Sequence, residues 1–227
     1  MKLILLRHGE SQWNLENRFT GWKDVSLTEN GINEAIFSAE QINQLNISIE
    51  SITTSILKRA QQTTEILVDK LNYPKEDVKV DWRLNERHYG ALQGLNKSET
   101  AKKYGEEQVK IWRRSYDIPP PAQNRDDPEH PVNLKLYSNI DPELVPDSES
   151  LKDTYERVIP YYKSQIENKL NNNIVVSAHG NSIRSMCKFL FELDNDEVTK
   201  LEIPTGNPLK ITFNNEKKLT DAIYLDK

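Results

Sequence analysis

The chain has 227 residues, a length that fits one large domain or two small ones and can bury a sizeable core. Its 36% hydrophobic and 29% charged residues exclude wholesale disorder, and its formal net charge of −5 argues against a nucleic-acid-binding protein. The single cysteine, Cys187, excludes an internal disulfide, and we find neither a signal-peptide core nor an apolar stretch that could span a membrane, so we expect a cytoplasmic protein.

The first predicted element is a short buried strand over residues 3–6, which is apolar without alternation, as in a central parallel strand. The strand ends at Arg7, His8 and Gly9, and a polar loop over residues 10–24 follows. Ligands of open α/β sheets bind beyond the carboxyl ends of the strands. We therefore expect His8 to be a nucleophile for phosphoryl groups.

Helices and strands then alternate along the chain. The predicted elements up to residue 111 are a helix over 29–45 capped by Thr28, a strand over 47–54, a helix over 56–71 capped by Ser55, an edge strand over 78–81, an irregular segment over 84–95 and a helix over 98–111 interrupted near Gly105. The later ones are a helix over 151–170 capped by Ser150 and kinked by Pro160, a strand over 174–177, a helix over 182–193 with Cys187 on its core face, and a terminal hairpin over 209–225.

Proline-rich residues 115–150 interrupt this alternation. We expect them to form an ordered insertion with little regular structure, a candidate lid, with a disordered linker as the alternative. The pattern predicts an α/β fold with three α/β/α layers and a mostly parallel central sheet flanked by helices. We expect a single domain over residues 1–227, with the irregular proline-rich insertion or lid at about residues 95–150.

Two apolar runs far apart in the sequence each end in a His-Gly pair, at His8 and at His179. If both are parallel strands of one sheet, the two histidines emerge at the same edge, where the following helices direct N-terminal amides at an anion. An imidazole nitrogen is a competent nucleophile. Arg7, Arg59 and a protonated His179 would neutralise the phosphate. Arg59 opposes the dipole of its predicted helix, which suggests a bound anion, although a solvated arginine is the alternative.

Other charged residues are weaker candidates. Glu86 lies in a glycine-containing irregular segment and is the best candidate for moving a proton, with a surface acid as the alternative. Three further cations suggest a substrate with more than one anionic group, although such residues are often only solvated: Lys97, Arg113 and Arg114. His88 is expected to pack locally or lie at the surface, and His130 to be exposed. Four histidines without a close pair argue against a metal site.

Several motifs together resemble the histidine phosphatase superfamily and, within it, the phosphoglycerate mutases that depend on 2,3-bisphosphoglycerate. They follow the family order across nearly the whole chain, and they are Arg7 through Asn14, Arg18 through Trp22, Leu57 through Ala60, Glu86 through Gly90, Leu95 through Lys97, Trp112 through Arg114, Ala178 through Ser182 and Ile203 through Gly206.

The resemblance implies that His8 becomes phosphorylated, that Arg7, Arg59 and His179 bind the transferred phosphoryl group, and that Glu86 is the acid/base. It also implies a set of substrate-binding residues: Ser11, Asn14, Thr20, Gly21, Tyr89, Lys97, Arg113, Arg114, Gly180 and Asn181.

The implied reaction interconverts 3-phosphoglycerate and 2-phosphoglycerate in glycolysis and gluconeogenesis, with 2,3-bisphosphoglycerate as primer and intermediate and without a metal. Family members are commonly homodimers or homotetramers, with an interface expected here at residues 47–73 or near Val78. A bisphosphoglycerate synthase or phosphatase, a general histidine acid phosphatase and a non-catalytic phospho-ligand sensor remain alternatives. Some members cover the site with a longer basic tail. Here only Asp226 and Lys227 follow Leu225, so we expect the insertion to exclude water.

Overall fold

A computed structural model describes residues 1–225, so the expectation about the C-terminal tail falls on residues outside the described part. The sheet has six strands: β1 (Lys2–Arg7), β2 (Ser51–Thr54), β3 (Lys79–Val80), β4 (Ile174–Ala178), β5 (Leu209–Phe213) and β6 (Leu219–Tyr224). Their order is β3-β2-β4-β1-β5-β6. Strands β3, β2, β4 and β1 pair in parallel, whereas β5 and β6 are antiparallel. The predicted mostly parallel sheet, the edge strand and the terminal hairpin are confirmed.

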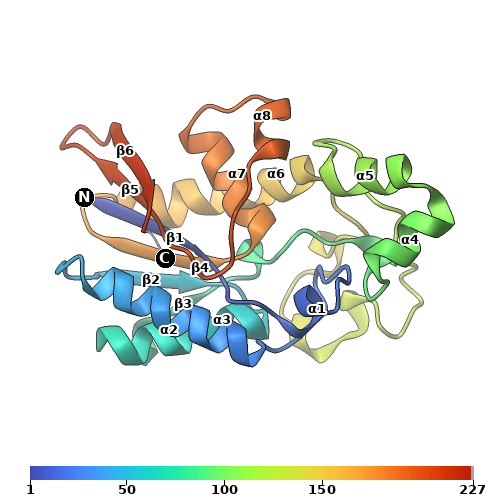
Figure 1. Ribbon diagram of the computed structural model, residues 1–227, viewed down its shortest axis with the longest axis horizontal. Helices are drawn as coiled ribbons and strands as arrows, with labels where there is room; N and C mark the ends of the chain where they lie inside the picture. The colour runs from blue at the N-terminus through green and yellow to red at the C-terminus, as the bar shows by residue number, and fades with distance from the viewer. Residues whose placement is uncertain (226–227) are drawn as a thin grey trace.

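Helices cover both faces of this sheet (Figure 1). They are α1 (Gln12–Leu15), α2 (Glu29–Asn43), α3 (Lys58–Leu71), α4 (Lys97–Tyr104), α5 (Glu106–Arg114), α6 (Leu151–Tyr161), α7 (Gly180–Leu190) and α8 (Asn195–Lys200). Helices α2 and α3 lie on one face, and α6 and α7 on the other (Figure 1). The predicted three-layer α/β/α architecture is therefore confirmed.

Strand β1 shows why its sequence is apolar without alternation. Leu3 and Leu5 pack into the core beneath α6 and α7, whereas Ile4 and Leu6 pack into the core beneath α2 and α3. Successive side chains of a strand point to opposite faces, so a strand that is covered on both sides needs apolar residues throughout. All four residues are at most 1% exposed.

The register of β1 and β4 decides where the two His-Gly pairs lie. The strands run parallel, with Arg7 opposite Ala178, so that the next residue of each strand is a histidine at the same edge. The backbone N–H of His8 donates to the carbonyl of Ala178 at 3.0 Å and extends the ladder by one bond. The predicted meeting of the two strand ends is confirmed.

Gly9 allows the chain to pass the start of α2. A Cβ atom added to Gly9 would lie 2.1 Å from the carbonyl oxygen of Gly31, well inside van der Waals contact. Because the obstructing atom belongs to the backbone, no side-chain movement relieves the clash. The glycine after His8 is thus required by packing against α2.

Several element boundaries differ from the predictions. The predicted caps Thr28 and Ser150 and the break at Gly105 are confirmed. Strand β2 begins four residues later than predicted, and α3 begins at Lys58 with Leu57 as its N-cap, so the predicted cap Ser55 is wrong.

In the C-terminal half of the chain, α6 ends at Tyr161, directly after Pro160. A π-helical turn over Tyr162–Ile166 and a 3-10 turn over Glu167–Lys169 follow it. Helix α7 begins at Gly180, two residues before its predicted start, and ends at Leu190. Cys187 is buried in the core, as predicted.

The proline-rich residues 115–150 form short 3-10 turns that pack against the rest of the protein, which contradicts the disordered linker. Tyr137 stacks on Trp22 with ring centroids 5.2 Å apart, and its hydroxyl donates to the Trp22 carbonyl. His130, expected at the surface, is fully buried, and its ring centroid lies 6.1 Å from that of His88. The insertion is anchored by buried aromatic rings, which the polar and proline-rich composition concealed.

The buried His88 makes stability depend on pH. Burial, together with the nearby charges of His130, Arg157 and Lys23, lowers the pKa of His88 to about 3 from its usual 6.5. The contribution of the neutral His88 to stability is therefore fully present above pH 6.5 and is lost as the pH falls towards 3. Over this range the unfolded chain binds a proton at His88 that the folded protein does not bind.

Each pH unit below 6.5 lowers the free energy of unfolding by about 1.4 kcal/mol through this one group. Between pH 7 and pH 5 we therefore expect the free energy of unfolding to fall by about 2 kcal/mol less in His88→Gln than in the wild type. Urea unfolding at the two pH values measures this difference, even if the variant is less stable at pH 7. Equal losses in both proteins would contradict a buried neutral His88.

None of the helices in residues 1–225 is both long and apolar enough to cross a membrane.

Candidate active site

The centre of the candidate site is the pair His8 and His179, which follow β1 and β4. Their ring centroids are 4.9 Å apart in an edge-to-face arrangement. His8 is 2% exposed and His179 is fully buried. Two imidazoles at this distance can both contact one phosphoryl group placed beside them.

The hydrogen bonds of His8 identify its tautomer. Nδ1 lies 2.7 Å from the carbonyl oxygen of Gly9, which can only accept, so Nδ1 carries the proton. Nε2 lies 3.2 Å from the donating Nε of Arg59, so Nε2 carries a lone pair. Burial, reinforced by the charges of Arg59 and Arg7, holds the pKa of His8 well below its usual 6.5. The ring is therefore neutral, with a nucleophilic nitrogen beside a guanidinium.

Backbone carbonyls hold Arg59 in place. Its Nη1 donates to the Lys23 carbonyl at 3.0 Å, and its Nη2 donates to the Gly21 carbonyl at 2.8 Å. Gly21 has a φ of +54°, a conformation that favours glycine and turns its carbonyl to the guanidinium. Burial lowers the pKa of Arg59 to about 10, so the side chain still carries its charge at neutral pH.

Arg7 supplies a second guanidinium. Its Nη1 donates to the carbonyl of Ile203 at 2.7 Å, while its buried Nε has no hydrogen-bond partner within residues 1–225. A buried N–H without a partner is unfavourable in a protein interior, and an oxyanion would satisfy it.

His179 differs from the prediction in its charge. Burial, with the charges of Arg59, Arg7 and Arg157, holds the pKa of His179 well below 6.5, so the ring is neutral, and the expected protonated His179 is wrong. Its Nε2 lies 2.7 Å from Oγ of Ser55, and its buried Nδ1 has no partner among the described residues. His179 is thus a neutral hydrogen-bonding group.

Glu86 lies beside Gly180 and the start of α7. Its Oε1 accepts three hydrogen bonds, from the Arg87 N–H at 2.7 Å, the Asn181 N–H at 3.2 Å and the Asn181 side chain at 2.8 Å. A Cβ atom on Gly180 would lie 3.7 Å from both Oε2 of Glu86 and Nε of Arg7. These three hydrogen bonds involve only Oε1, so Oε2 of Glu86 is available to bind a proton. Because Gly180 has no side chain, the space between Oε2 of Glu86 and Nε of Arg7 stays open.

The pKa of Glu86 is lowered by a balance of opposing effects. Burial alone would raise it, but the hydrogen bonds from Arg87 and Asn181 and the charges of Arg59 and Arg7 outweigh burial. The carboxylate is therefore ionised at neutral pH and can accept a proton.

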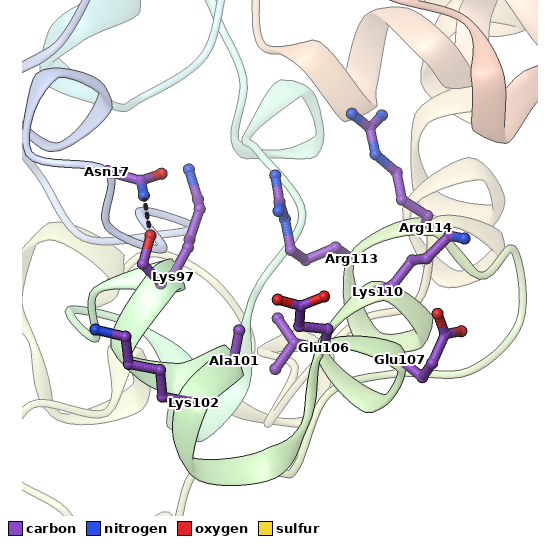
Figure 2. A pocket seen from close by; sticks show the side chains of 11 residues that line it. Asn17, Lys97, Ala101, Lys102, Glu106, Glu107, Lys110, Arg113 and Arg114 are labelled. Atoms are coloured by element: carbon purple, nitrogen blue, oxygen red, sulfur yellow. Dashed lines mark hydrogen bonds between the residues drawn. The ribbon is translucent and has the colours of Figure 1, made fainter.

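The outer cations line a separate cavity of about 700 Å³ between α4 and α5 (Figure 2). Lys97 comes from the start of α4, and Arg113 and Arg114 come from the end of α5. In Figure 2 their side chains extend towards the same side of the cavity. The histidines do not line it, and Arg114 is held by Glu202 at 2.9 Å. The predicted residues therefore form a buried reaction centre and an outer cationic cavity.

A smaller cavity lies between the reaction centre and the outer cationic cavity. Two of its lining residues, Arg87 and Arg184, had no predicted role. It is lined by Arg113, Arg114, Asn181, Arg87 and Arg184, among others. Arg87 is fully buried, and its Nε and Nη1 have no partner in the described chain, although Nη2 donates to the Arg113 carbonyl at 3.0 Å. Its position beside Glu86 was the only sequence signal.

Arg184 lies one helical turn beyond Asn181, and its Nη1 donates to Oδ1 of Asn181 at 3.2 Å. This bond orients the Asn181 amide group towards Glu86. Spacing of three residues on one helix face was the signal that could have indicated it.

Four predicted substrate-binding residues have mainly local contacts. Ser11 caps α1, and its hydroxyl donates to the side chain of Asn14 at 2.8 Å. Thr20 is buried in the loop before Gly21. Tyr89 lies under the guanidinium of Arg87, 4.6 Å from ring centroid to Cζ, and accepts a 3.4 Å contact from Asn181.

Within residues 1–225, no three His, Cys, Asp or Glu side chains are grouped so that they could hold a metal ion.

Solved structures share the fold over almost the whole chain. YhfR of Bacillus stearothermophilus has a TM-score of 0.72 at 20% identity and covers 96% of this chain and 94% of its own. A mycobacterial glucosyl-3-phosphoglycerate phosphatase in complex with VO3 has a TM-score of 0.70 at 24% identity and covers 93% and 92%. These similarities concern the fold.

Sequence relatives are closer. A 2,3-bisphosphoglycerate-dependent phosphoglycerate mutase of Pelagibacter ubique (strain HTCC1062) is 52% identical over 227 residues, covering 99% of this chain and 95% of that protein. The mutase of the same description from Hydrogenobaculum sp. (strain Y04AAS1) is 48% identical over 225 residues, covering 98% and 91%. The histidine phosphatase superfamily (branch 1) matches residues 3–225. The chain thus belongs to the histidine phosphatase superfamily and, within it, to the family of the 2,3-bisphosphoglycerate-dependent phosphoglycerate mutases.

Proposed function

We propose that the protein is a phosphoglycerate mutase, an isomerase that interconverts 3-phosphoglycerate and 2-phosphoglycerate through a phosphohistidine on His8. The observation that carries the proposal is the lone pair on Nε2 of a neutral, buried His8, 3.2 Å from Nε of Arg59. A nucleophile for phosphate needs an uncharged nitrogen and a cation that neutralises the phosphoryl oxygens. Two relatives that are 52% and 48% identical to the chain are named for this activity.

In the proposed transfer, Nε2 of His8 attacks phosphorus, and the bond between phosphorus and the sugar-acid oxygen breaks. Glu86, which is ionised in the free site, gives that leaving oxygen the proton that it has taken from a substrate hydroxyl in the preceding, reverse transfer. In the reverse direction Glu86 takes the proton of a substrate hydroxyl, whose oxygen attacks phosphorus, and the electron pair of the P–N bond returns to Nε2. Transfer through His8 to the other glycerate oxygen exchanges the 2- and 3-positions.

Charge stabilisation in this scheme comes from Arg7, Arg59 and His179. Phosphoryl transfer depends mainly on positioning and on neutralising the equatorial oxygens. Arg59 is fixed by two carbonyls, while Nε of Arg7 and Nδ1 of His179 are buried donor positions without a partner in the described chain.

The primer in this proposal is 2,3-bisphosphoglycerate, which supplies the phosphoryl group that loads His8. The donor set suits such a polyanion. Beyond the reaction centre, Arg87, whose Nε and Nη1 have no partner in the described chain, lines the small cavity, and Lys97, Arg113 and Arg114 line the outer one. Guanidinium groups bind phosphate and carboxylate in two-point contacts. We assign the second phosphate and the carboxylate to these residues, with Ser11, Asn14, Thr20, Gly21, Tyr89, Gly180 and Asn181 completing the substrate site.

We further propose that residues 1–227 act as one domain and that residues 95–150 serve as the lid. Helices α4 and α5 carry the outer cations and lie beyond the carboxyl ends of the strands (Figure 1). Bound substrate would pull them inward and exclude water, which otherwise hydrolyses phosphohistidine. We place the enzyme in the cytoplasm, where phosphoglycerates are metabolised, as a homodimer or homotetramer.

The decisive experiment compares isomerisation of 3-phosphoglycerate with release of inorganic phosphate, in EDTA, with and without 2,3-bisphosphoglycerate. We expect isomerisation to exceed phosphate release and to rise at least several-fold with primer, because unphosphorylated His8 cannot start the cycle. Dominant phosphate release would instead support a phosphatase, net formation of bisphosphoglycerate a synthase, and complete loss of activity in EDTA a metal-dependent mechanism.

A further inference from the structure

Ser55 contacts a residue of the reaction centre, His179, but is not itself among the predicted substrate-binding residues. It follows β2, is fully buried, and places its Oγ 2.7 Å from Nε2 of His179. The same Oγ accepts the backbone N–H of Leu57 at 3.2 Å. The residue lies at the strand end next to β4, so the sheet itself sets its position relative to His179.

Hydrogen-bond accounting assigns the protons of this pair. A serine hydroxyl has one proton to donate and lone pairs to accept with. The Leu57 N–H already occupies one lone pair, and His179 is the only other partner of Ser55 Oγ among the described residues. If Nε2 of His179 carried the proton, the serine proton would be buried without an acceptor, which is unfavourable in a protein interior. The hydroxyl therefore donates to Nε2.

We propose that Ser55 is a positioning residue that fixes His179 in the tautomer with its proton on Nδ1, so that His179 donates a hydrogen bond to the transferring phosphoryl group while uncharged. Nδ1 is the ring nitrogen that is buried without a partner. With the other tautomer, Nδ1 would present a lone pair to an anion, which repels it. The role in catalysis rests on the proposed function, whereas the tautomer does not.

Nitrogen-15 NMR of the histidine rings tests the tautomer directly, because the two nitrogens of a neutral ring have distinct chemical shifts. The chain has only four histidines, so spectra of His8→Gln, His88→Gln, His130→Gln and His179→Gln assign every signal. At pH 7.5 we expect wild-type His179 to be neutral with its proton on Nδ1. Ser55→Ala is expected to move the proton to Nε2 or to give a mixture.

Kinetics test the catalytic consequence. By analogy with partners that fix the tautomer of metal-bound histidines, we expect Ser55→Ala to lower kcat by about 10-fold to 100-fold. KM should change less than about threefold, and Ser55→Thr, which keeps the hydroxyl, should restore most of the rate. Thr54→Val is the matched control, because it removes a neighbouring buried hydroxyl that donates to the Ser177 carbonyl at 2.8 Å rather than to His179. It should leave both the tautomer and kcat unchanged.

Two results would overturn the proposal: a wild-type His179 with its proton on Nε2, or a folded Ser55→Ala protein with unchanged tautomer and kcat. The wild-type spectrum decides the tautomer even if Ser55→Ala does not fold. Wild-type protein that lacks mutase activity but shows the expected tautomer would contradict the proposed function and leave the placement of the proton standing.

Discussion

Replacing His8 by alanine is expected to abolish the phosphoenzyme and to lower mutase activity by about 10⁶-fold, the order of magnitude for loss of a catalytic nucleophile. The neutral ring presents the lone pair of Nε2 beside Nε of Arg59, and within residues 1–225 His179 is the one other imidazole in contact with it. His179 does not replace it, because its Nε2 is occupied by Ser55.

The measurement is incubation with 2,3-bisphosphoglycerate labelled with phosphorus-32, followed by acid and alkali treatment of the protein. Phosphohistidine is expected to lose its label in acid and to keep it in alkali. His130→Gln is the matched control, since His130 is equally buried but lies within the proline-rich insertion, where it contacts Asp147. A folded His8→Ala protein that labels like the wild type would place the nucleophile elsewhere.

The meeting of His8 and His179 could be predicted because it depends on one rule. Parallel neighbouring strands bring their carboxyl ends together, so two apolar runs that each end in His-Gly must place both imidazoles at one edge. The pairing of Arg7 with Ala178 in the sheet shows this directly, because the next residue of each strand is one of the two histidines.

Properties set by contacts between distant segments could not be predicted in the same way. Ser55 has the local signature of a helix cap, yet the chain turns at Leu57 and the serine side chain meets His179, 124 residues away. The neutral state of His179 follows from its burial beside arginine guanidinium groups, and burial is not visible in a single His-Gly pair. His130 looked solvent-exposed because its sequence neighbours are polar, but its ring packs towards His88.

The outer cations illustrate a similar limit. Lys97, Arg113 and Arg114 were correctly grouped by their charge, but the sequence did not reveal that they line a cavity separate from the histidines. Their distance from His8 depends on how α4 and α5 pack, which is governed by a small cluster around Phe19, Leu92 and Val109. This separation is the physical reason to expect a closing movement of the lid.

Replacing Glu86 by glutamine is expected to lower kcat by about 10²-fold to 10⁴-fold, the usual contribution of a general acid/base, while KM changes only a few-fold. Glutamine keeps the size of the side chain and an acceptor oxygen for Asn181 but cannot exchange a proton. Steady-state rates with saturating primer measure both constants. Undiminished kcat would remove Glu86 from the proposed role.

The pH dependence separates proton transfer by Glu86 from a purely structural contribution. Hydrogen bonds from Arg87 and Asn181 and the charges of Arg59 and Arg7 outweigh burial and lower the pKa of Glu86, so the carboxylate loses its basic form only below its usual pKa of 4.5. Asn181→Ala removes one of these hydrogen bonds and should raise that pKa, moving the acid limb of kcat/KM to higher pH, because protonation then sets in earlier. A limb that stays in place in Asn181→Ala would show that another group controls it. In Glu86→Gln the residual rate should no longer respond to this ionisation, since the titrating carboxyl is gone.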